Sequence, residues 1–508
     1  MSQPNETYIN TGPEGFLDGC AGLFAKKSFL RMMFATDERA SGGCFRIYAV
    51  FSPPESGNFE ILVQDVSDVK SPSFASITRK VPAAHWYERE IRDMFGITPE
   101  GHPDPRPLVL HGMYPEGVWP LRRDVSADDV RRVVDISRED NYQYMSVKGE
   151  GVYEIPVGPV HAGIIEPGHF RFSAVGETIY HLDPRLFYTH KGIEKQFERI
   201  GFIGGVELAE RVSGVSSFSH SAAYCHAVER MAGIELPEKA AAARTALIEL
   251  ERLYNHIGDI GNMCAGTGFA VGYARGASIK ETLMRLNQRL TGSRYLRGVN
   301  VVGGIKTDVL EHSDDILTTL DLVKREYKSF LALLLSSISH VERMEDAGIL
   351  SRSVAHSMGA TGPAARASGV GDDVRHAHPH LFYDRVIFET HTRTKGDVFA
   401  RMMVRADEVG CSLSIIEALL EKPYKGKLAV PVGSVPPLSS ALGYVEGPRG
   451  SIFYWVKSDK DGKPLRVKAR SASHCNWPVV PFAVNGNIVP DFPLINKSFN
   501  LSYSGCDL

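Results

Sequence analysis

The chain has 508 residues, of which 43% are hydrophobic and 23% are charged, and its formal net charge is −3. This length exceeds one ordinary domain and can bury large cores, so we expect two or three domains. The nearly neutral balance, with only short and isolated Lys/Arg clusters, argues against nucleic-acid binding. The longest apolar stretch, residues 330–335, ends at Ser336, far short of the roughly 20 residues that a membrane span needs. We therefore expect no direct membrane span.

The first residues lack a basic start followed by an apolar core, so no secretory signal is expected and the default location is cytoplasmic. The seven cysteines are sparse and nowhere spaced as Cys-x-x-Cys. They are typical of reduced, mostly structural cysteines in a large core.

Residues 1–125 predict a small α+β domain. They contain a short helix-like opening and two alternating stretches, 45–51 and 59–64, that favour β-strands. The next stretch, residues 126–155, is polar, charged and rich in glycine, and predicts a linker.

Residues 156–508 predict a mainly helical domain with small β elements. Apolar residues recur at three- and four-residue spacing over 237–263, and similar patterns predict long helices over 315–345 and 396–421. The alternating stretch 443–468 predicts a hairpin. The expected fold class is therefore α+β.

A charged block in the first domain is the first specific motif. Taken alone, its acidic and basic residues indicate ion pairs along the solvated face of a helix: Glu88, Arg89, Arg92 and Asp93. As a pattern, however, residues 85–96, followed by Gly-His-Pro-Asp at 101–104 and Leu-Arg-Arg-Asp at 121–124, resemble the C-type subunit of NADH-quinone oxidoreductase, respiratory complex I. That resemblance implies a docking domain in the peripheral arm without a cofactor.

The second domain opens with motifs at 158–163, 165–172 and 188–195. They resemble both the D-type subunit of complex I and the large subunit of membrane-bound [NiFe]-hydrogenases of the formate hydrogenlyase type. Further matches, including 249–253 and 446–450, extend the resemblance along nearly the whole chain. The order of the two domains is that of formate hydrogenlyase large subunits. The resemblance implies a domain of the complex I C type followed by a [NiFe]-hydrogenase large-subunit-like domain.

Hydrogenases of this family bind nickel and iron through two Cys-x-x-Cys pairs, and both pairs can be located here. The four ligand positions are occupied by Ser213, Ser216, Ser502 and Gly505. Serine has a far higher pKa than the thiol value of about 8.5 and is a hard oxygen ligand when it does bind. We therefore expect no metal in this chain, as in energy-converting hydrogenase-related complexes.

Cys506 lies one position beyond the last ligand position. This offset of one residue turns its side chain in a different direction. A rearranged metal site could use this cysteine together with Cys225, Cys264 or Cys475, but none of them has ligand spacing. Burial as a small hydrophobic side chain is the preferred interpretation for all four.

The resemblance also implies candidate functional residues. Glu166 occupies the place where hydrogenases pass protons from the centre, and its alternative role is that of a structural hydrogen-bonding acid. Complex I places a histidine and a tyrosine beside its quinone. The histidine falls in the segment that ends at His169, whereas the tyrosine position aligns with Gly214, so quinone binding is only half supported.

Two further candidates flank the altered ligand positions. His220 is expected to line the emptied pocket, together with Arg211. Arg449, which points at the iron ligands in hydrogenases, is expected either to bind an anion or to pair with Glu446.

Three functional hypotheses follow. The preferred one is a core peripheral-arm subunit of a membrane-bound, hydrogenase-related oxidoreductase that couples electron transfer to ion translocation without nickel-iron hydrogen chemistry. The alternatives are a quinone-reducing C/D-type subunit of an NADH-quinone oxidoreductase, with NAD binding in that complex, and a non-catalytic docking subunit. No cofactor is expected in this chain. The expected partners are an iron-sulfur small subunit, similar to the B-type subunit of complex I, and antiporter-like membrane subunits, at the cytoplasmic face of the inner (plasma) membrane.

Overall fold

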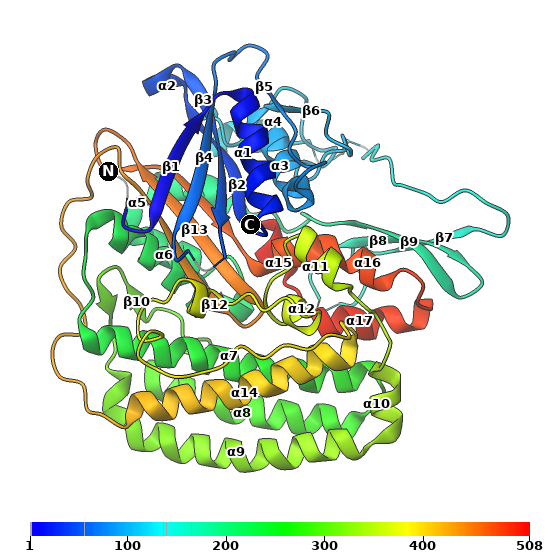
Figure 1. Cartoon of the computed structure of the whole chain (residues 1–508), viewed down its shortest axis with the longest axis vertical. Helices are drawn as coiled ribbons and strands as arrows, with labels where there is room; N and C mark the ends of the chain where they lie inside the picture. The colour runs from blue at the N-terminus through cyan, green and yellow to red at the C-terminus, as the bar shows by residue number, and fades with distance from the viewer. Residues whose placement is uncertain (1–2, 55, 136, 139, 164) are drawn as a thin grey trace.

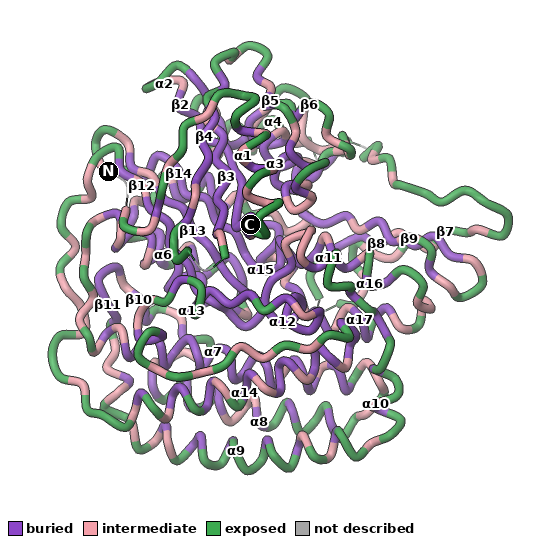
Figure 2. The backbone as a smooth tube through the Cα atoms, in the orientation of Figure 1, coloured by how far each residue is buried: buried purple, intermediate pink, exposed green. Residues whose placement is uncertain are grey.

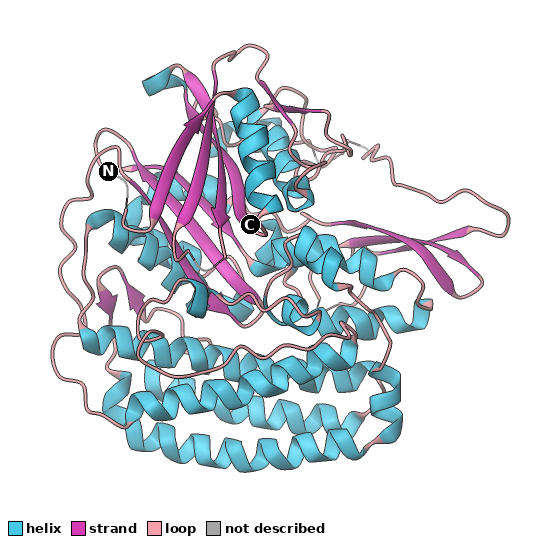
Figure 3. Ribbon diagram, viewed as in Figure 1, coloured by secondary structure: helices cyan, strands magenta, loops and turns pink. Residues whose placement is uncertain are grey.

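The computed structural model describes residues 3–508 except 55, 136, 139 and 164. Among these residues, no helix combines the length and the apolar character that crossing a membrane requires. Three layers are visible in Figure 1: an N-terminal sheet, a central sheet beneath it and a layer of long helices. Figure 3 shows that most strands lie in the upper half of the view, together with several helices, and that the lower half is mainly helical.

The N-terminal part is a four-stranded sheet in the order β1-β4-β3-β2, in which only the β1–β4 pair is parallel. In β2, nine of ten positions are buried, because helices cover one face of the sheet and the central sheet covers the other. The two strands predicted at 45–51 and 59–64 are present as β3 and β4. The elements of this part are β1 (Glu6–Thr11), α1 (Pro13–Ala25), β2 (Phe29–Glu38), α2 (Arg39–Gly42), β3 (Cys44–Ser52), β4 (Phe59–Val66), β5 (Ser73–Ala75), η1 (Pro82–Ala84), α3 (His85–Phe95) and β6 (Thr98–Glu100).

The charged helix α3 is not the solvated face that its sequence alone suggested. The Glu88 carboxylate is fully buried and accepts hydrogen bonds from the loop that precedes the helix, at 2.6 Å from the Ile77 amide. The Asp93 carboxylate accepts the amides of Leu108 and Val109 at 2.6 and 2.8 Å. The prediction of a solvated face was wrong because Glu88 and Asp93 are buried and bind backbone amides outside the helix, although Arg92 and Asp93 also pair with each other at 3.1 Å.

Residues 126–155, predicted as a linker, contain one short helix, α4 (Ala127–Val133), which Ser126 caps through its side chain. The other described residues of the segment are largely exposed, and from Tyr153 on they belong to strand β7 of an arm that projects from the body (Figure 1). The arm is a three-stranded antiparallel sheet of β7 (Tyr153–Val157), β8 (His169–Val175) and β9 (Thr178–Arg185).

The central sheet joins the N-terminal sheet to the helices. Its strands β12 (Ser440–Gly447), β13 (Gly450–Ser458) and β14 (Pro464–Arg470) are antiparallel, and the hairpin predicted at 443–468 is β13–β14. Trp455 is fully buried, with its ring centroid 4.8 Å from that of Phe34 and 5.0 Å from that of Tyr48. These aromatic contacts attach the central sheet to β2 and β3.

The helical layer is built around α7 (Glu238–Gly266), which is buried along most of its length (Figure 2). It packs against α8 (Ala270–Thr291) and α14 (Val398–Leu420), while α9 (Ser313–Ser336) forms the outer surface. The helices predicted at 237–263 and 396–421 are α7 and α14. The helix predicted over 315–345 is wrong in extent, because the chain leaves helical geometry at Ser337, where φ is −88° and ψ is 95°.

The remaining elements of the second part include the buried helix α6 and a series of mostly shorter segments. They are α5 (Ile193–Ala209), η2 (Gly214–Ser216), α6 (Ser217–Ala232), β10 (Asn300–Val301), β11 (Gly304–Ile305), η3 (Val309–His312), α10 (Ile338–Met344), α11 (Arg352–Ser357), α12 (Gly362–Ala367), α13 (Val374–Ala377), α15 (Ala472–Asn476), η4 (Trp477–Val479), α16 (Val480–Val484), η5 (Val489–Asp491), α17 (Phe492–Phe499) and α18 (Tyr503–Asp507). The α+β fold class is confirmed.

Candidate functional site

The altered ligand positions come together between the start of α6 and the C-terminal helix α18. The Ser213 hydroxyl donates to the Ser502 hydroxyl at 3.1 Å, although the two residues are 289 positions apart. Ser502 caps α18, and its hydroxyl accepts the Gly505 amide at 2.9 Å. Ser216 closes the turn on the opposite side, where its amide donates to the Ser213 carbonyl at 3.2 Å. The two sequence motifs therefore form one site.

This donor set does not fit a nickel-iron centre. Where the resemblance implies four soft thiolates, the chain has hydroxyl groups and a glycine, and the Ser213 and Ser502 hydroxyls bind each other. There is also little space, because a Cβ atom added to Gly505 would lie 3.1 Å from both the Ser213 Cβ and the Ser502 Oγ. The expectation that the chain holds no metal stays a prediction.

Cys506 does not replace the missing ligands. Its side chain is fully buried and lines a separate small cavity with His474 and Glu194. Burial raises the pKa of its thiol well above the ordinary value. All seven cysteines are free, and six of them are buried.

A cavity of about 640 Å³ opens beside the altered ligand positions. Its walls come from the segment that precedes β8, from α7 and α8, and from the C-terminal segment 496–504. Glu166 lies exposed on this cavity, where its carboxylate accepts the Ser504 amide at 2.8 Å. Gly214, at the position of the complex I tyrosine, also lines it but offers no side chain.

Arg449 forms the inner wall of this cavity. Its guanidinium donates to the side chains of Asn255 at 3.0 Å and Asp259 at 3.2 Å, and to the backbone carbonyl of Asn500. Glu446 pairs instead with Arg366 at 2.8 Å, so the predicted Arg449–Glu446 pair was wrong. Because β12 and β13 meet in a tight turn, the two side chains point to different layers.

Sequence reasoning missed three residues of this wall. Asn255 and Asp259 lie one turn apart on α7, in line with the buried Glu251, and Lys280 faces them from α8. Burial lowers the pKa of the Lys280 ammonium, although Asp259 opposes that shift. The four-residue spacing of Glu251, Asn255 and Asp259 along one line of the helix was the available signal.

A network of buried charges continues from this wall into the core. The Arg405 guanidinium lies 3.5 Å from the Asp259 carboxylate. Farther along, Glu408 binds Arg252 at 2.7 Å and Arg366 at 2.8 Å. Such pairs are strongly destabilising to break, since the partner is left as an unpaired buried charge.

Two acids near this network titrate close to neutrality. Burial raises the pKa of Glu446 to about 7, with the Asp373 charge acting in the same direction. Burial also raises the pKa of Glu251 to about 7, against hydrogen bonds from the Ser219 hydroxyl and backbone. Acids with such pKa values can exchange protons at physiological pH.

The two candidate histidines lie away from the cavity. The His169 ring lies 5.0 Å from that of Tyr144, and its Nδ1 is 3.3 Å from the Gly158 carbonyl oxygen. His220 is buried within α6 with its Nδ1 3.0 Å from the Tyr454 hydroxyl, and burial lowers its pKa to about 3. Arg211 is exposed. The expectation that His220 lines the pocket was wrong, since the helix turns that side chain toward the central sheet.

Two family models match the chain. The 30 Kd subunit of respiratory-chain NADH dehydrogenase matches residues 9–131, and the 49 Kd subunit of the same enzyme matches residues 266–435 and 424–508.

Individual relatives include subunits of formate hydrogenlyase and of NADH-quinone oxidoreductase. Formate hydrogenlyase subunit 5 of Escherichia coli is 37% identical over 95% of this chain and 85% of its own length. The C/D subunit of NADH-quinone oxidoreductase from Phocaeicola vulgatus is 30% identical over 79% of this chain and 80% of its own length.

A solved structure of the membrane-bound sulfane sulfur reductase, an archaeal respiratory membrane complex, contains a similar chain. It has a TM-score of 0.66 and 28% identity, and it covers 71% of this chain and all of that chain. The chain therefore belongs to the family in which the 30 Kd and 49 Kd subunits of respiratory-chain NADH dehydrogenase are fused, shared with formate hydrogenlyase subunit 5.

Proposed function

We propose that this chain is a core peripheral-arm subunit of a membrane-bound, hydrogenase-related oxidoreductase that couples electron transfer to ion translocation without nickel-iron hydrogen chemistry. The hydrogen bond between Ser213 and Ser502 carries the proposal. It joins two positions where relatives with hydrogenase activity need thiolates, while Arg449 and the adjoining cavity are retained.

The partners in this proposal are an iron-sulfur small subunit and antiporter-like membrane subunits, at the cytoplasmic face of the inner membrane. The mouth of the cavity supports a partner on this face, because Ile165 is 43% exposed and Tyr273 is 50% exposed. Apolar side chains gathered at a polar-rimmed opening are typical of an interaction surface. The iron-sulfur clusters would belong to the partner, which supplies the electrons.

The residues of this chain then handle charge and protons beside the electron source. Arg449 and Lys280 provide positive charge where an acceptor gains electrons. Glu166, exposed at the opening, is the proton carrier in this scheme. The buried acids Glu251 and Glu446 have pKa values of about 7. They are therefore suited to take up or release protons when the charge at the cavity changes.

Quinone reduction is the alternative that we do not prefer. The complex I tyrosine position is Gly214, and His169 contacts Tyr144 instead of the cavity. Reduction of a quinone therefore lacks both hydrogen-bonding side chains that the resemblance implies.

The test is purification of the intact complex with its copurifying subunits. We expect nickel far below one atom per copy and no hydrogen evolution with reduced viologen. Nickel near one atom per copy, or robust hydrogen evolution, contradicts the proposal. Copurification of NADH-oxidising flavin subunits would favour the NADH-quinone oxidoreductase alternative, with NAD binding in those subunits.

A pair of variants separates catalysis from simple docking. Glu166→Gln should slow turnover and ion movement in vesicles, whereas Glu177→Gln, at an exposed turn of the arm, should not. If both variants behave as the unaltered complex, the chain is a docking subunit without a catalytic cavity.

A further inference from the structure

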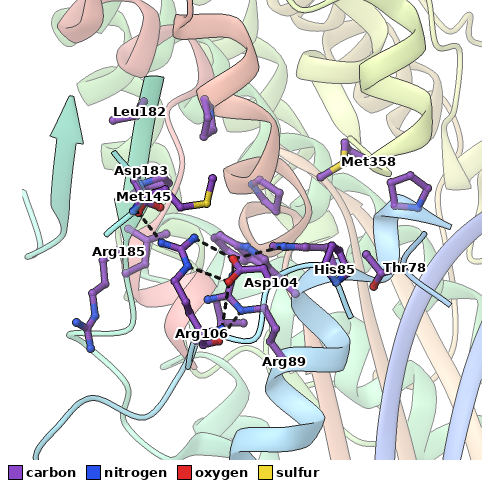
Figure 4. Close-up of a pocket in the computed structure, with 18 of the residues that line it drawn as sticks. Thr78, His85, Arg89, Asp104, Arg106, Met145, Leu182, Asp183, Arg185 and Met358 are labelled. Atoms are coloured by element: carbon purple, nitrogen blue, oxygen red, sulfur yellow. Dashed lines mark hydrogen bonds and ion pairs between the residues drawn. The ribbon is translucent and has the colours of Figure 1, made fainter. Parts of the chain in front are cut away.

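A second cavity, of about 570 Å³, lies between the two parts of the chain (Figure 4). It is bounded by α3, by the loop 103–108, by β9 and by residues 478–482. None of the residues discussed for the first site lines it. Its volume is in the range of pockets that enclose small organic ligands.

Most of the acidic and basic side chains in the wall of this cavity pair with one another. Asp104 accepts from Arg89 at 3.0 Å and from Arg106 at 2.9 Å, and Arg106 also donates to Asp183 at 2.6 Å (Figure 4). Two guanidinium groups thus face two carboxylates. A charged ligand that bound at these four residues would have to break one of the pairs.

Arg185, which also lines the cavity, is similarly occupied. It pairs with Asp140 at 2.6 Å, and its guanidinium carbon lies 3.9 Å from the centroid of the Tyr142 ring. The wall therefore holds the two parts of the chain together, and among its guanidinium groups only that of the exposed Arg79 has no carboxylate partner among the described residues.

Two imidazole nitrogens in the cavity wall have no hydrogen-bond partner among the described residues. They are the Nδ1 atom of His85 and the Nε2 atom of His181, and both are buried. A buried polar atom without a partner is destabilising, so each of the two atoms needs an explanation. Both histidines line this one cavity.

The protonation of His85 fixes which partner it needs. Burial and the nearby Arg89 charge lower its pKa to about 3, so the ring is neutral at pH 7. Its Nε2 lies 3.7 Å from the Asp104 carboxylate. The negative charge of that carboxylate favours the tautomer that carries the hydrogen on Nε2. The Nδ1 atom is then an acceptor, and a ligand must offer a donor.

Most of the remaining lining is apolar, apart from Thr78 and Arg79. Trp86, Leu182, Met358 and Phe482 line the cavity, together with several prolines, and Phe482 is 48% exposed. Aromatic rings and a thioether pack well against a flat ring.

We propose that this cavity binds a small uncharged aromatic molecule that carries a hydroxyl donor, of the phenol class, with the hydroxyl directed to His85. Because its walls come from both parts of the chain, the bound molecule also stabilises their junction. The proposal does not depend on the function of the first site.

The test uses the full-length chain and three probes with one ring system. 2-Naphthol has the hydroxyl donor, 2-methoxynaphthalene keeps the oxygen without the donor, and naphthalene-2-sulfonate carries a charge. Fluorescence titration should show 2-naphthol binding at least about tenfold more tightly than either of the others, the effect of one hydrogen bond to a buried acceptor.

Variants locate the site. His85→Phe should remove the preference for 2-naphthol, whereas His312→Phe, at an exposed position, should retain it. Met358→Trp should weaken the binding of all three probes, because the larger side chain fills the cavity. Thermal unfolding checks that each variant is folded.

Equal binding of 2-naphthol and 2-methoxynaphthalene, tighter binding of the sulfonate, or a preference unchanged in His85→Phe overturns the proposal. If His85→Phe does not fold, the three probes on the unaltered chain and the Met358→Trp variant decide it.

Discussion

A disulfide introduced between the two altered ligand motifs would test the geometry of the site directly. In the double variant Ser213→Cys/Ser502→Cys, two thiols would replace hydroxyls whose oxygens are 3.1 Å apart. Since a C–S bond is longer than a C–O bond and a disulfide measures about 2.05 Å, the sulfurs can reach each other with small side-chain rotations. We expect a disulfide after mild oxidation.

The expected gain in the free energy of unfolding follows from the number of residues in the loop that the disulfide closes. For residues 289 positions apart, the chain-entropy model gives a stabilisation of about 5–6 kcal/mol as an upper limit. Strain usually reduces this, and about 2–4 kcal/mol is the typical result for a disulfide. The oxidised variant should therefore unfold at a clearly higher temperature than the same protein after reduction.

The assay is peptide mapping by mass spectrometry of the oxidised protein, together with thermal unfolding before and after reduction. The single variants are the controls, because neither introduced cysteine then has its intended partner. Failure of the double variant to form the bond would refute the convergence of the two motifs. A bond between Cys506 and the cysteine of Ser213→Cys would also refute it, since Cys506 lines a different cavity.

Three further predictions concern the junction of the two parts, the pH dependence and the central sheet. Arg31→Met should cost about 3–5 kcal/mol in chemical denaturation, because Asp372 is left as an unpaired buried charge; a cost below about 1 kcal/mol would contradict this. Burial raises the pKa of Asp507 to about 6 from 3.8, so the folded state holds its proton more tightly, and this contribution to stability is lost as the pH rises from about 4 to 6. Asp507→Asn should flatten this part of the stability curve, and an unchanged slope would count against the shift. Gly443→Ala should lower the unfolding temperature markedly, since the added Cβ would lie 2.2 Å from the Ala227 backbone nitrogen, and an unaffected temperature would be inconsistent with this close approach of β12 and α6.

The sequence was informative where the signal is local. Apolar periodicity located α7 and α14 within three residues at each end, because a helix buried along one face repeats its apolar side chains every three to four residues. The break at Ser337 was missed, since both sides of it keep a helical pattern and only the backbone shows the interruption.

The charged helix α3 shows the limit of such reasoning. Its acidic residues looked solvated because their partners, backbone amides at 77 and 108–109, lie outside the helix. The same limit explains Arg449, whose partners Asn255 and Asp259 are about 190 positions away. Interactions between distant segments leave no periodic trace in the sequence.

The sequence by itself determined the α+β class, the order of the two parts and the absence of cysteine from the four positions at which the resemblance implies metal ligands, since each is a matter of residue type or local pattern. Only the tertiary structure decided that Ser213 and Ser502 meet, that Glu166 and Arg449 share a cavity, and that His220 points elsewhere. The cavity beside His85 was likewise invisible before folding, because its walls come from segments far apart in the chain. Side-chain direction and the pairing of distant charges depend on how whole layers pack, and no short stretch of sequence contains that information.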